Sequence, residues 1–374
     1  MANIFDYIDW RDISLEKVEF NEIDNLILAR VSYFPFDSLI NKGEIITLSE
    51  AYRRYMEIGG KGKILIEQDI ELFPRLANSI RFGNVKLYNY INKIDPKKDK
   101  QFSAITMYLP DDTVYVSYRG TDNTLVGWKE DFNMSFSDYI ESQIDAKDYL
   151  NSVSLNFKNK FLRVGGHSKG GNLAVFAAAF CDQKIQKKII NVYNNDGPGF
   201  SDKVINSEGY QKILDRVHTY IPQSSIIGRL LNHEEKTTIL KSTEVGIMQH
   251  DLYSWQVLGD KFVETELTDS SEFFDKTITD WLKQVTDEQR SEFFDILFEV
   301  LNATNVKTLS ELKSNKFSNA KTLIKTYNNL TQESKDIMTK TLSAFFKIGK
   351  DNIQMPKHKK IDEIKFGKLI KNKK

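Results

Sequence analysis

Residues 166–170, Gly-His-Ser-Lys-Gly, constrain the fold of this chain more than any other stretch. They form a G-x-S-x-G motif between a predicted short strand at residues 161–164 and an alanine-rich helix that runs from about residue 172 to Cys181. A tight strand-to-helix turn strains the backbone of the serine, and glycine on both sides leaves room for it. Ser168 is then presented at a helix N-terminus, where negative charge is favoured. The motif predicts a nucleophilic serine; a plain structural turn is the alternative.

The flanking sequence alternates between strand and helix patterns. Apolar residues alternate over residues 104–118 around a turn at residues 110–112, which predicts a β-hairpin. Residues 145–157 have helical spacing, and residues 189–193 and 217–221 each have a strand pattern that ends near Gly or Pro. Strands that alternate with helices indicate a mostly parallel sheet in an α/β domain.

Several of these motifs resemble those of a known family. The predicted hairpin ends in Ser-Tyr-Arg-Gly-Thr at residues 117–121, and Trp128 and Asp131 follow. Together with Gly-His-Ser-Lys-Gly-Gly at residues 166–171, they resemble the lipase class 3 branch of the α/β-hydrolases, in the family's order. The resemblance covers about residues 104–255 and implies an α/β-hydrolase core with a mostly parallel sheet.

A closer resemblance depends on three segments. Residues 21–37, the run Gly-His-Ser-Lys-Gly-Gly-Asn-Leu-Ala and residues 246–255 look like an uncharacterised bacterial family of lipase-like proteins, a domain of unknown function. This likeness implies a fold and no particular substrate.

The lipase resemblance also implies two donors of an oxyanion hole. In that family the residue after Arg-Gly supplies one donor, here Thr121, and the backbone N–H of Lys169 supplies the other. A small hydroxyl residue at the carboxyl end of a strand also lies where an open α/β sheet places its active site. The alternative is that Thr121 binds its own backbone in a turn. We expect Arg119 to hold a loop or a carboxylate such as Asp131.

A nucleophilic serine needs a base, and the chain has five histidines. His250 lies 82 residues after the serine, beyond the last predicted strand, where the family places its catalytic histidine. His233, in an Asn-His-Glu-Glu turn, is the main alternative. We expect His167 to pack beside the nucleophile and His218 to lie in a strand, and His358 belongs to the basic end of the chain.

The acid that orients the histidine is harder to assign. The resemblance implies an Asp after the strand at residues 217–221, but Pro-Gln-Ser-Ser follows there and holds no carboxylate. Asp196, in Asn-Asn-Asp-Gly-Pro-Gly, follows the preceding strand. An acid has only to reach the second imidazole nitrogen and select its tautomer. We therefore predict Asp196, with a Ser-His dyad or a polar substitute such as Ser224 as alternatives.

Charge and composition bear on partners. The 52 basic and 52 acidic residues leave no net charge, so we predict no nucleic-acid partner. Residues 356–374 hold eight Lys against two acidic residues, a net charge of +6, which predicts a solvated terminus or a weak peripheral contact with anionic membrane. No metal-ligand spacing is present, so we predict no cofactor and no metal.

Other features favour a cytoplasmic location. Residues 1–10 lack the basic and apolar regions of a signal peptide, and the longest apolar stretch, residues 173–181, is too short to span a membrane. The single cysteine, Cys181, excludes a disulfide within the chain.

The composition divides the chain into three predicted parts: an α/β-hydrolase domain at residues 1–259, an α-helical region at 260–355 and a basic tail at 356–374. Within the hydrolase domain, we predict N-terminal helices at 1–100 and a catalytic core at 101–259. Residues 260–348 contain neither Gly nor Pro, and helix starts are predicted at Thr286 and Thr308. Each helix has an apolar face that must be buried. We expect residues 260–348 to dock on the core and to bring Phe or Leu side chains near Ser168, whereas an accessory bundle far from the site is the alternative.

These observations predict a serine hydrolase, lipase- or esterase-like, that cleaves an ester or thioester through an acyl-enzyme at Ser168. Lipid-like acyl substrates are favoured by the resemblance alone. Two alternatives remain at this point: a thioesterase or peptidase with the same site, and a degenerate hydrolase fold that binds a ligand or partner. The second is motivated by the missing class 3 acid.

Overall fold

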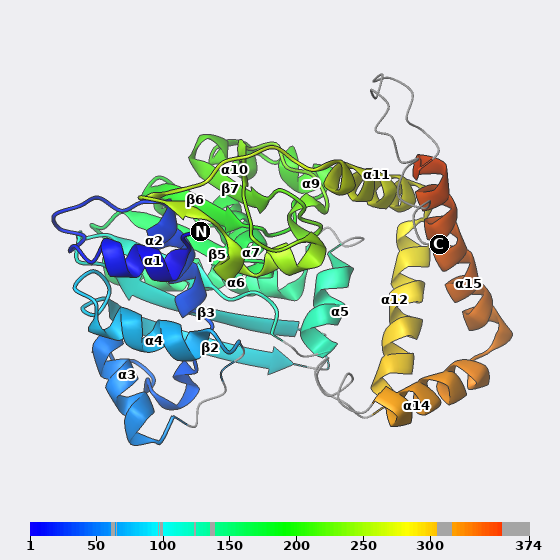
Figure 1. Cartoon of the computed structure of the whole chain (residues 1–374), viewed down its shortest axis with the longest axis horizontal. Coiled ribbons are helices and arrows are strands. Elements are labelled where there is room, and N and C mark those ends of the chain that lie inside the picture. Colours follow the sequence, from blue (N-terminus) through cyan, green and yellow to red (C-terminus); the bar gives the residue numbers. More distant parts are fainter. Residues whose placement is uncertain are drawn as a thin grey trace, which may run out of the picture.

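A twisted sheet lies at the centre of the molecule, with helices on both of its faces (Figure 1). The computed structural model describes residues 1–60, 64, 66–95, 97, 100–122, 125–134, 139–304 and 316–353. The predicted basic tail and the predicted helix start at Thr308 lie outside these residues.

The eight strands of this sheet, as found in the described residues, stand side by side in their order along the chain. They are β1 (Ile46–Thr47), β2 (Lys86–Asp95), β3 (Lys100–Tyr108), β4 (Val114–Tyr118), β5 (Leu162–His167), β6 (Ile189–Asn195), β7 (Val217–Pro222) and β8 (Thr237–Leu240). Strands β1 to β4 pair antiparallel, and strands β4 to β8 pair parallel. Because parallel neighbours need crossover connections, helices cover this half of the sheet.

The sheet separates two apolar cores. On one face, Ile105, Met107 and Tyr115 pack against the N-terminal helices. These are α1 (Ile4–Trp10), α2 (Glu22–Val31), α3 (Leu48–Glu57) and α4 (Asp69–Asn78). On the other face, Val116 and Val164 pack in a second core with the crossover helices. These include α6 (Glu141–Ser154), α7 (Lys169–Phe180) and the short helices α8 (Gln183–Gln186), α9 (Asp202–Ile205) and α10 (Glu208–Gln211).

The predicted hairpin, the strands after it and the helix within residues 145–157 are all present. The helix after the serine motif begins at Lys169, three residues before the predicted start, because Gly170 and Gly171 belong to its first turn. Strands β1, β2 and β8 were not predicted. In β2 the apolar alternation is interrupted by polar residues, and its pairing with β3 shifts register between Tyr88 and Ile91.

The C-terminal helices follow, and side chains of all but the third of those described form a third core. They are α11 (Asp269–Gln284), α12 (Asp287–Asn302), α14 (Lys316–Asn329) and α15 (Gln332–Ile353). Thr286 and Gln289 make the predicted reciprocal cap of α12. This helix lies next to α5 (Leu125–Asn133) of the α/β core, where Lys129 and Asp295 form an ion pair of 3.0 Å (Figure 1). The helical region therefore docks on the core.

One further hairpin joins the two parts of the chain. Strand β9 (Val257–Leu258) pairs with β10 (Lys261–Phe262) across the predicted boundary at residue 259. The predicted fold class, an α/β-hydrolase core with a mostly parallel sheet and a C-terminal helical region, is confirmed. The division into separate domains stays a prediction.

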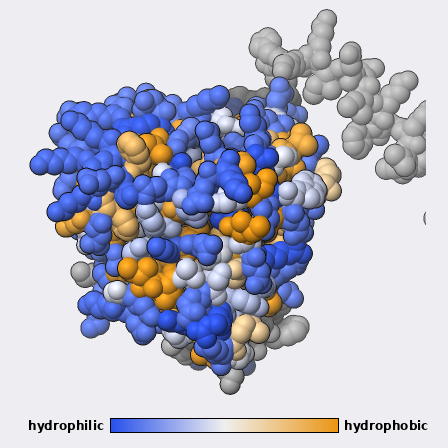
Figure 2. Space-filling model, turned by 90° about the vertical axis from the view of Figure 1, so that its left-hand side faces the viewer, coloured by the Kyte–Doolittle hydropathy of each residue, from blue (hydrophilic) through white to orange (hydrophobic). Residues whose placement is uncertain are grey.

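The surface on the side of the N-terminal helices is mostly hydrophilic, and its apolar residues form several separate spots (Figure 2). Among the helices of the described residues, each is too short or too polar to cross a bilayer.

Candidate active site

The predicted serine turn has the strained geometry that its sequence implies. Ser168 stands between β5 and α7 with φ 59° and ψ −136°, a conformation that a non-glycine residue rarely adopts. A Cβ atom on Gly166 would meet the carbonyl carbon of Gly170 at 2.3 Å, and one on Gly170 would meet the carbonyl oxygen of Tyr118 at 2.1 Å. Both glycines are thus required, because any side chain there would collide with backbone.

The structure brings His250 and Asp196 together. The Nδ1 atom of His250 lies 2.7 Å from Oδ2 of Asp196, which is fully buried directly after β6. The second carboxylate oxygen accepts a hydrogen bond of 2.5 Å from the hydroxyl of Ser225. Because a carboxylate accepts, Nδ1 carries the proton in the neutral ring and Nε2 keeps its lone pair. This is the arrangement that a general base needs.

His167 contacts His250 through a hydrogen bond and through its ring. Its Nε2 atom donates to the backbone oxygen of His250 at 2.9 Å, and the two rings lie 4.6 Å apart. Burial, with the neighbouring His250, lowers the pKa of His167 well below its usual value, so the ring is neutral at pH 7. The Tyr33 hydroxyl donates to the backbone oxygen of His167 and accepts from the N–H of Gly120. His167 packs as expected, but its support of His250 and the roles of Tyr33 and Ser225 were not predicted.

Thr121 and Lys169, the predicted oxyanion residues, lie on either side of Asp131. The hydroxyl of Thr121 donates to Oδ2 of Asp131. The ammonium of Lys169 is fully buried, 2.9 Å from Oε2 of Glu130 and 3.6 Å from Oδ1 of Asp131. Burial raises the pKa of Asp131 to about 6, although Lys169 lowers it.

Arg119 holds a carboxylate of its own loop, as expected, but that carboxylate belongs to Asp122 and not to Asp131. The guanidinium of Arg119 lies 3.8 Å from Oδ2 of Asp122 and 3.0 Å from Oδ1 of Asn92. Asp131 pairs instead with Lys169, whose ammonium lies 3.6 Å from its Oδ1 atom.

The alternatives for base and acid lie elsewhere. His233 pairs with Glu235 at 2.8 Å and is outside the set of described residues that line the cavity with Ser168. The hydroxyl of Ser224 is 2.8 Å from that of Thr268, so among the described contacts it is Asp196, and not Ser224, that meets His250.

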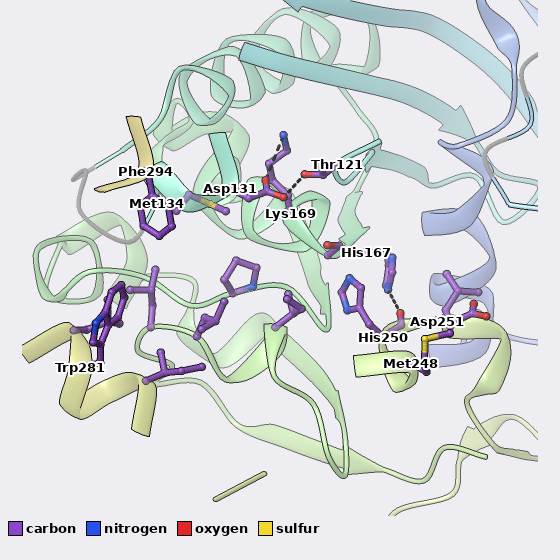
Figure 3. A pocket seen from close by; sticks show the side chains of 18 of the residues that line it. Thr121, Asp131, Met134, His167, Lys169, Met248, His250, Asp251, Trp281 and Phe294 are labelled. Atoms are coloured by element: carbon purple, nitrogen blue, oxygen red, sulfur yellow. Dashed lines mark hydrogen bonds and ion pairs between the residues drawn. The ribbon is translucent and has the colours of Figure 1, made fainter. Parts of the chain in front are cut away.

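Ser168 and His250 open into one cavity of about 590 Å³, which Thr121 and Lys169 also line. In Figure 3, Trp281 and Phe294 stand on the side opposite His167 and His250. The helical region contributes mainly apolar side chains to this wall, among them Ile278, Leu282, Phe293, Leu342 and Phe345. The expectation that residues 260–348 bring Phe and Leu side chains near Ser168 is therefore confirmed.

The family of the chain follows from its sequence. Residues 76–299, more than half of the chain, match the model of the Mbeg1-like family. The chain belongs to the Mbeg1-like family. The matched segment of this Mbeg1-like chain holds Thr121, Ser168, Asp196 and His250, as well as α11 and all but the last three residues of α12.

The solved structures that match parts of the chain include lipases from fungi. Lipase from Rhizopus microsporus var. chinensis is 14% identical, with a TM-score of 0.37, over 64% of the Mbeg1-like chain and 89% of the lipase. Lipase II from Rhizopus niveus is also 14% identical, with a TM-score of 0.36 over 52% and 77%. The Rhizomucor miehei lipase propeptide complex has a TM-score of 0.35 at 14% identity, over 50% of this chain and 63% of its own.

A comparison with curated proteins found no match. The predicted lipase-like character agrees with the membership of the Mbeg1-like family. The bacterial origin stays a prediction.

Proposed function

We propose that this protein is a serine hydrolase that cleaves a carboxylic ester or thioester through an acyl-enzyme at Ser168. The observation that carries the proposal is the His250–Asp196 pair of 2.7 Å, whose histidine lines the same cavity as a serine in a strained strand-to-helix turn. The three side chains have the roles of nucleophile, base and orienting acid.

The proposed reaction has two halves. In the first, Oγ of Ser168 attacks the carbonyl carbon while Nε2 of His250 takes the hydroxyl proton and then returns it to the departing alcohol or thiol. In the second, a water attacks the acyl-enzyme, His250 takes a proton from that water, and Ser168 regains it as the acid leaves. Asp196 stabilises the imidazolium in both halves without accepting its proton.

The negative oxygen of each tetrahedral intermediate requires donors. The backbone N–H of Lys169 lies at the first position of α7, where the helix dipole is positive. Thr121 follows β4 and lines the same cavity. Because its single hydroxyl proton is donated to Asp131, its backbone N–H is the proposed second donor.

The cavity wall supports a lipid-like acyl group as the substrate part next to Ser168. Aromatic and aliphatic side chains of α11, α12 and α15 line the same cavity as Ser168, and such a wall favours apolar chains over charged or peptide groups. An ester of a hydrophobic acid is therefore our preferred substrate class. Weak contact of residues 356–374 with anionic membranes and a cytoplasmic location are further proposals on the sequence alone.

A degenerate fold that only binds a partner is the rival, and it was motivated by the acid missing after residues 217–221. Asp196 supplies a carboxylate to His250 from another strand end, which removes this motive. A fluorophosphonate probe with mass spectrometry of the labelled peptide tests the choice. Labelling at Ser168 that disappears in Ser168→Ala is expected, and unlabelled protein with a normal circular dichroism spectrum would favour the binding module.

A further inference from the structure

Lys169, the residue after the proposed nucleophile, places its side chain in a buried ionic network. The ammonium of Lys169 donates to Oε2 of Glu130 at 2.9 Å and to the backbone oxygen and Oε1 of Gln101 at 3.1 and 3.2 Å. It also lies 3.6 Å from Oδ1 of Asp131. Figure 3 shows Lys169, Asp131 and Thr121 close together at the edge of the pocket.

Burying this ionic network costs desolvation free energy, which apolar side chains packed in the same place would not lose. An ion pair shut away from water loses its hydration, and apolar residues of similar size often serve stability as well or better. Glu130 is also engaged by backbone, since its two carboxylate oxygens accept from the N–H groups of Gln101 and Ser142. The network thus links β3, α5, α6 and the serine turn around one ammonium.

One carboxylate of the network reaches the oxyanion hole. Asp131 accepts the hydroxyl hydrogen bond of Thr121 through Oδ2 while its Oδ1 faces Lys169. Lys169 is thereby connected to both proposed donors, since it carries one of them on its own backbone and reaches the residue that carries the other through Asp131.

We propose that the Lys169 side chain is a positioning group of the oxyanion hole: its ammonium holds the Asp131 carboxylate, and this carboxylate holds Thr121. The inference deepens the proposed function and rests on it. The ammonium touches neither substrate nor reacting atoms, so Lys169 acts through Asp131.

The charges around Asp131 give the proposal a measurable consequence. Burial raises the pKa of Asp131 to about 6, Lys169 lowers it, and Glu130 raises it. Tyr33 also faces Asp131, and the Arg119 and Asp122 pair lies on the neighbouring loop. Removing the positive charge must raise the pKa of Asp131 further, so the carboxyl is then protonated at neutral pH and is a weaker acceptor for Thr121.

Carbon-13 NMR of the full chain labelled at its aspartate carboxyl carbons measures this ionisation without any turnover, with Asp131→Asn identifying the signal. The wild-type signal is expected to titrate near pH 6. In Lys169→Met the midpoint is expected to rise by about one to three pH units, whereas Lys169→Arg restores it. Lys160→Met removes a surface charge paired with Asp112 and is the matched control, with an unmoved midpoint.

An unmoved Asp131 midpoint in Lys169→Met overturns the proposal. Should Lys169→Met fail to fold, Lys169→Gln removes the same charge and keeps a hydrogen-bond donor, so the midpoint is again expected to rise; an unchanged midpoint in that variant overturns the proposal equally.

Kinetics on a short p-nitrophenyl ester link the network to the reaction. We expect kcat of Lys169→Met to fall by about 100- to 1,000-fold, since Thr121 is no longer held. In the plot of kcat/KM against pH, the loss of activity on the acidic side is expected to move to higher pH. In a protein that already carries Asp131→Asn, adding Lys169→Met is expected to leave the acidic side of the kcat/KM profile where it is. A wild type that neither labels with fluorophosphonate nor hydrolyses esters contradicts the proposed function, whereas an active Lys169→Met with an unmoved acidic side of the profile contradicts this inference alone.

Discussion

The Nδ1 atom of His250 lies 2.7 Å from Oδ2 of Asp196, although 54 residues separate the two along the chain. Asp196 adopts a positive φ of 53° directly after β6, and the hydroxyl of Ser225 binds its other carboxylate oxygen. A buried carboxylate in a strained turn, aimed at a histidine beside a serine, is typical of an orienting acid.

Replacing Asp196 tests that role. Asp196→Asn keeps the shape of the side chain but favours the wrong imidazole tautomer, so kcat is expected to fall by about 10⁴-fold with the fold intact. Ser224→Ala is the matched control, because its hydroxyl contacts Thr268, and it should keep wild-type kcat. The reverse pattern would move the acid function to the loop after β7.

Replacing the histidines separates the two candidate bases. His250→Ala is expected to lose ester hydrolysis to an extent comparable with loss of the serine, since no base remains to take the proton. His233→Ala should keep activity and lose only the contact with Glu235. Steady-state kinetics on both purified variants measure this difference. An active His250→Ala together with an inactive His233→Ala would assign the base to His233.

Replacing Ser168 tests both chemistry and strain. Ser168→Ala is expected to lower kcat about a million-fold. Ser168→Gly is equally inactive, but glycine tolerates the positive φ, so it should be about 1 kcal/mol more stable than Ser168→Ala after its larger unfolded-state entropy is subtracted. Urea unfolding of the two variants compares them, and equal midpoints would contradict strain at this turn.

Acyl preference tests the wall formed by the helical region. Phe294→Ala enlarges the cavity beside Ser168 and is expected to shift the best substrate toward longer or bulkier acyl chains. Phe298→Ala removes a side chain from the same helix and the same apolar core without lining the cavity, so it should cost similar stability and leave the preference unchanged. The measurement is the rate of hydrolysis over a series of p-nitrophenyl esters of increasing acyl length. Identical profiles for both variants would show that this wall does not select the substrate.

Acid stability tests the buried Glu235. Burial alone would raise the pKa of Glu235, but hydrogen bonds from His233, Thr219 and Tyr210 lower it to about 2. A depressed folded-state pKa contributes stability above the unfolded value near 4.5, and this contribution is lost as the pH falls through about 2. Glu235→Gln is therefore expected to be clearly destabilised at pH 7 and less so toward pH 3, as measured by urea unfolding at both pH values. A destabilisation that is the same at both would contradict the depressed pKa.

The sequence by itself determined those features that depend on neighbouring residues. Gly166 permits the tight strand-to-helix turn, because a side chain there would collide with the backbone of Gly170 four residues later. Thr286 and Gln289 start α12 by capping each other three residues apart. The alternating apolar residues of β3 and β4 specify a hairpin in the same local way.

Only the tertiary structure decided which distant groups meet. Asp196 was one of several candidates in the sequence, and the parallel order of β5, β6 and β7 places its turn beside the loop that carries His250. The wall of the cavity likewise depends on how α12 docks against α5, a contact between segments more than 150 residues apart. Such contacts arise from the summed burial of whole faces, which no short stretch of sequence encodes, whereas turns and caps arise from the sterics and hydrogen bonds of a few adjacent residues.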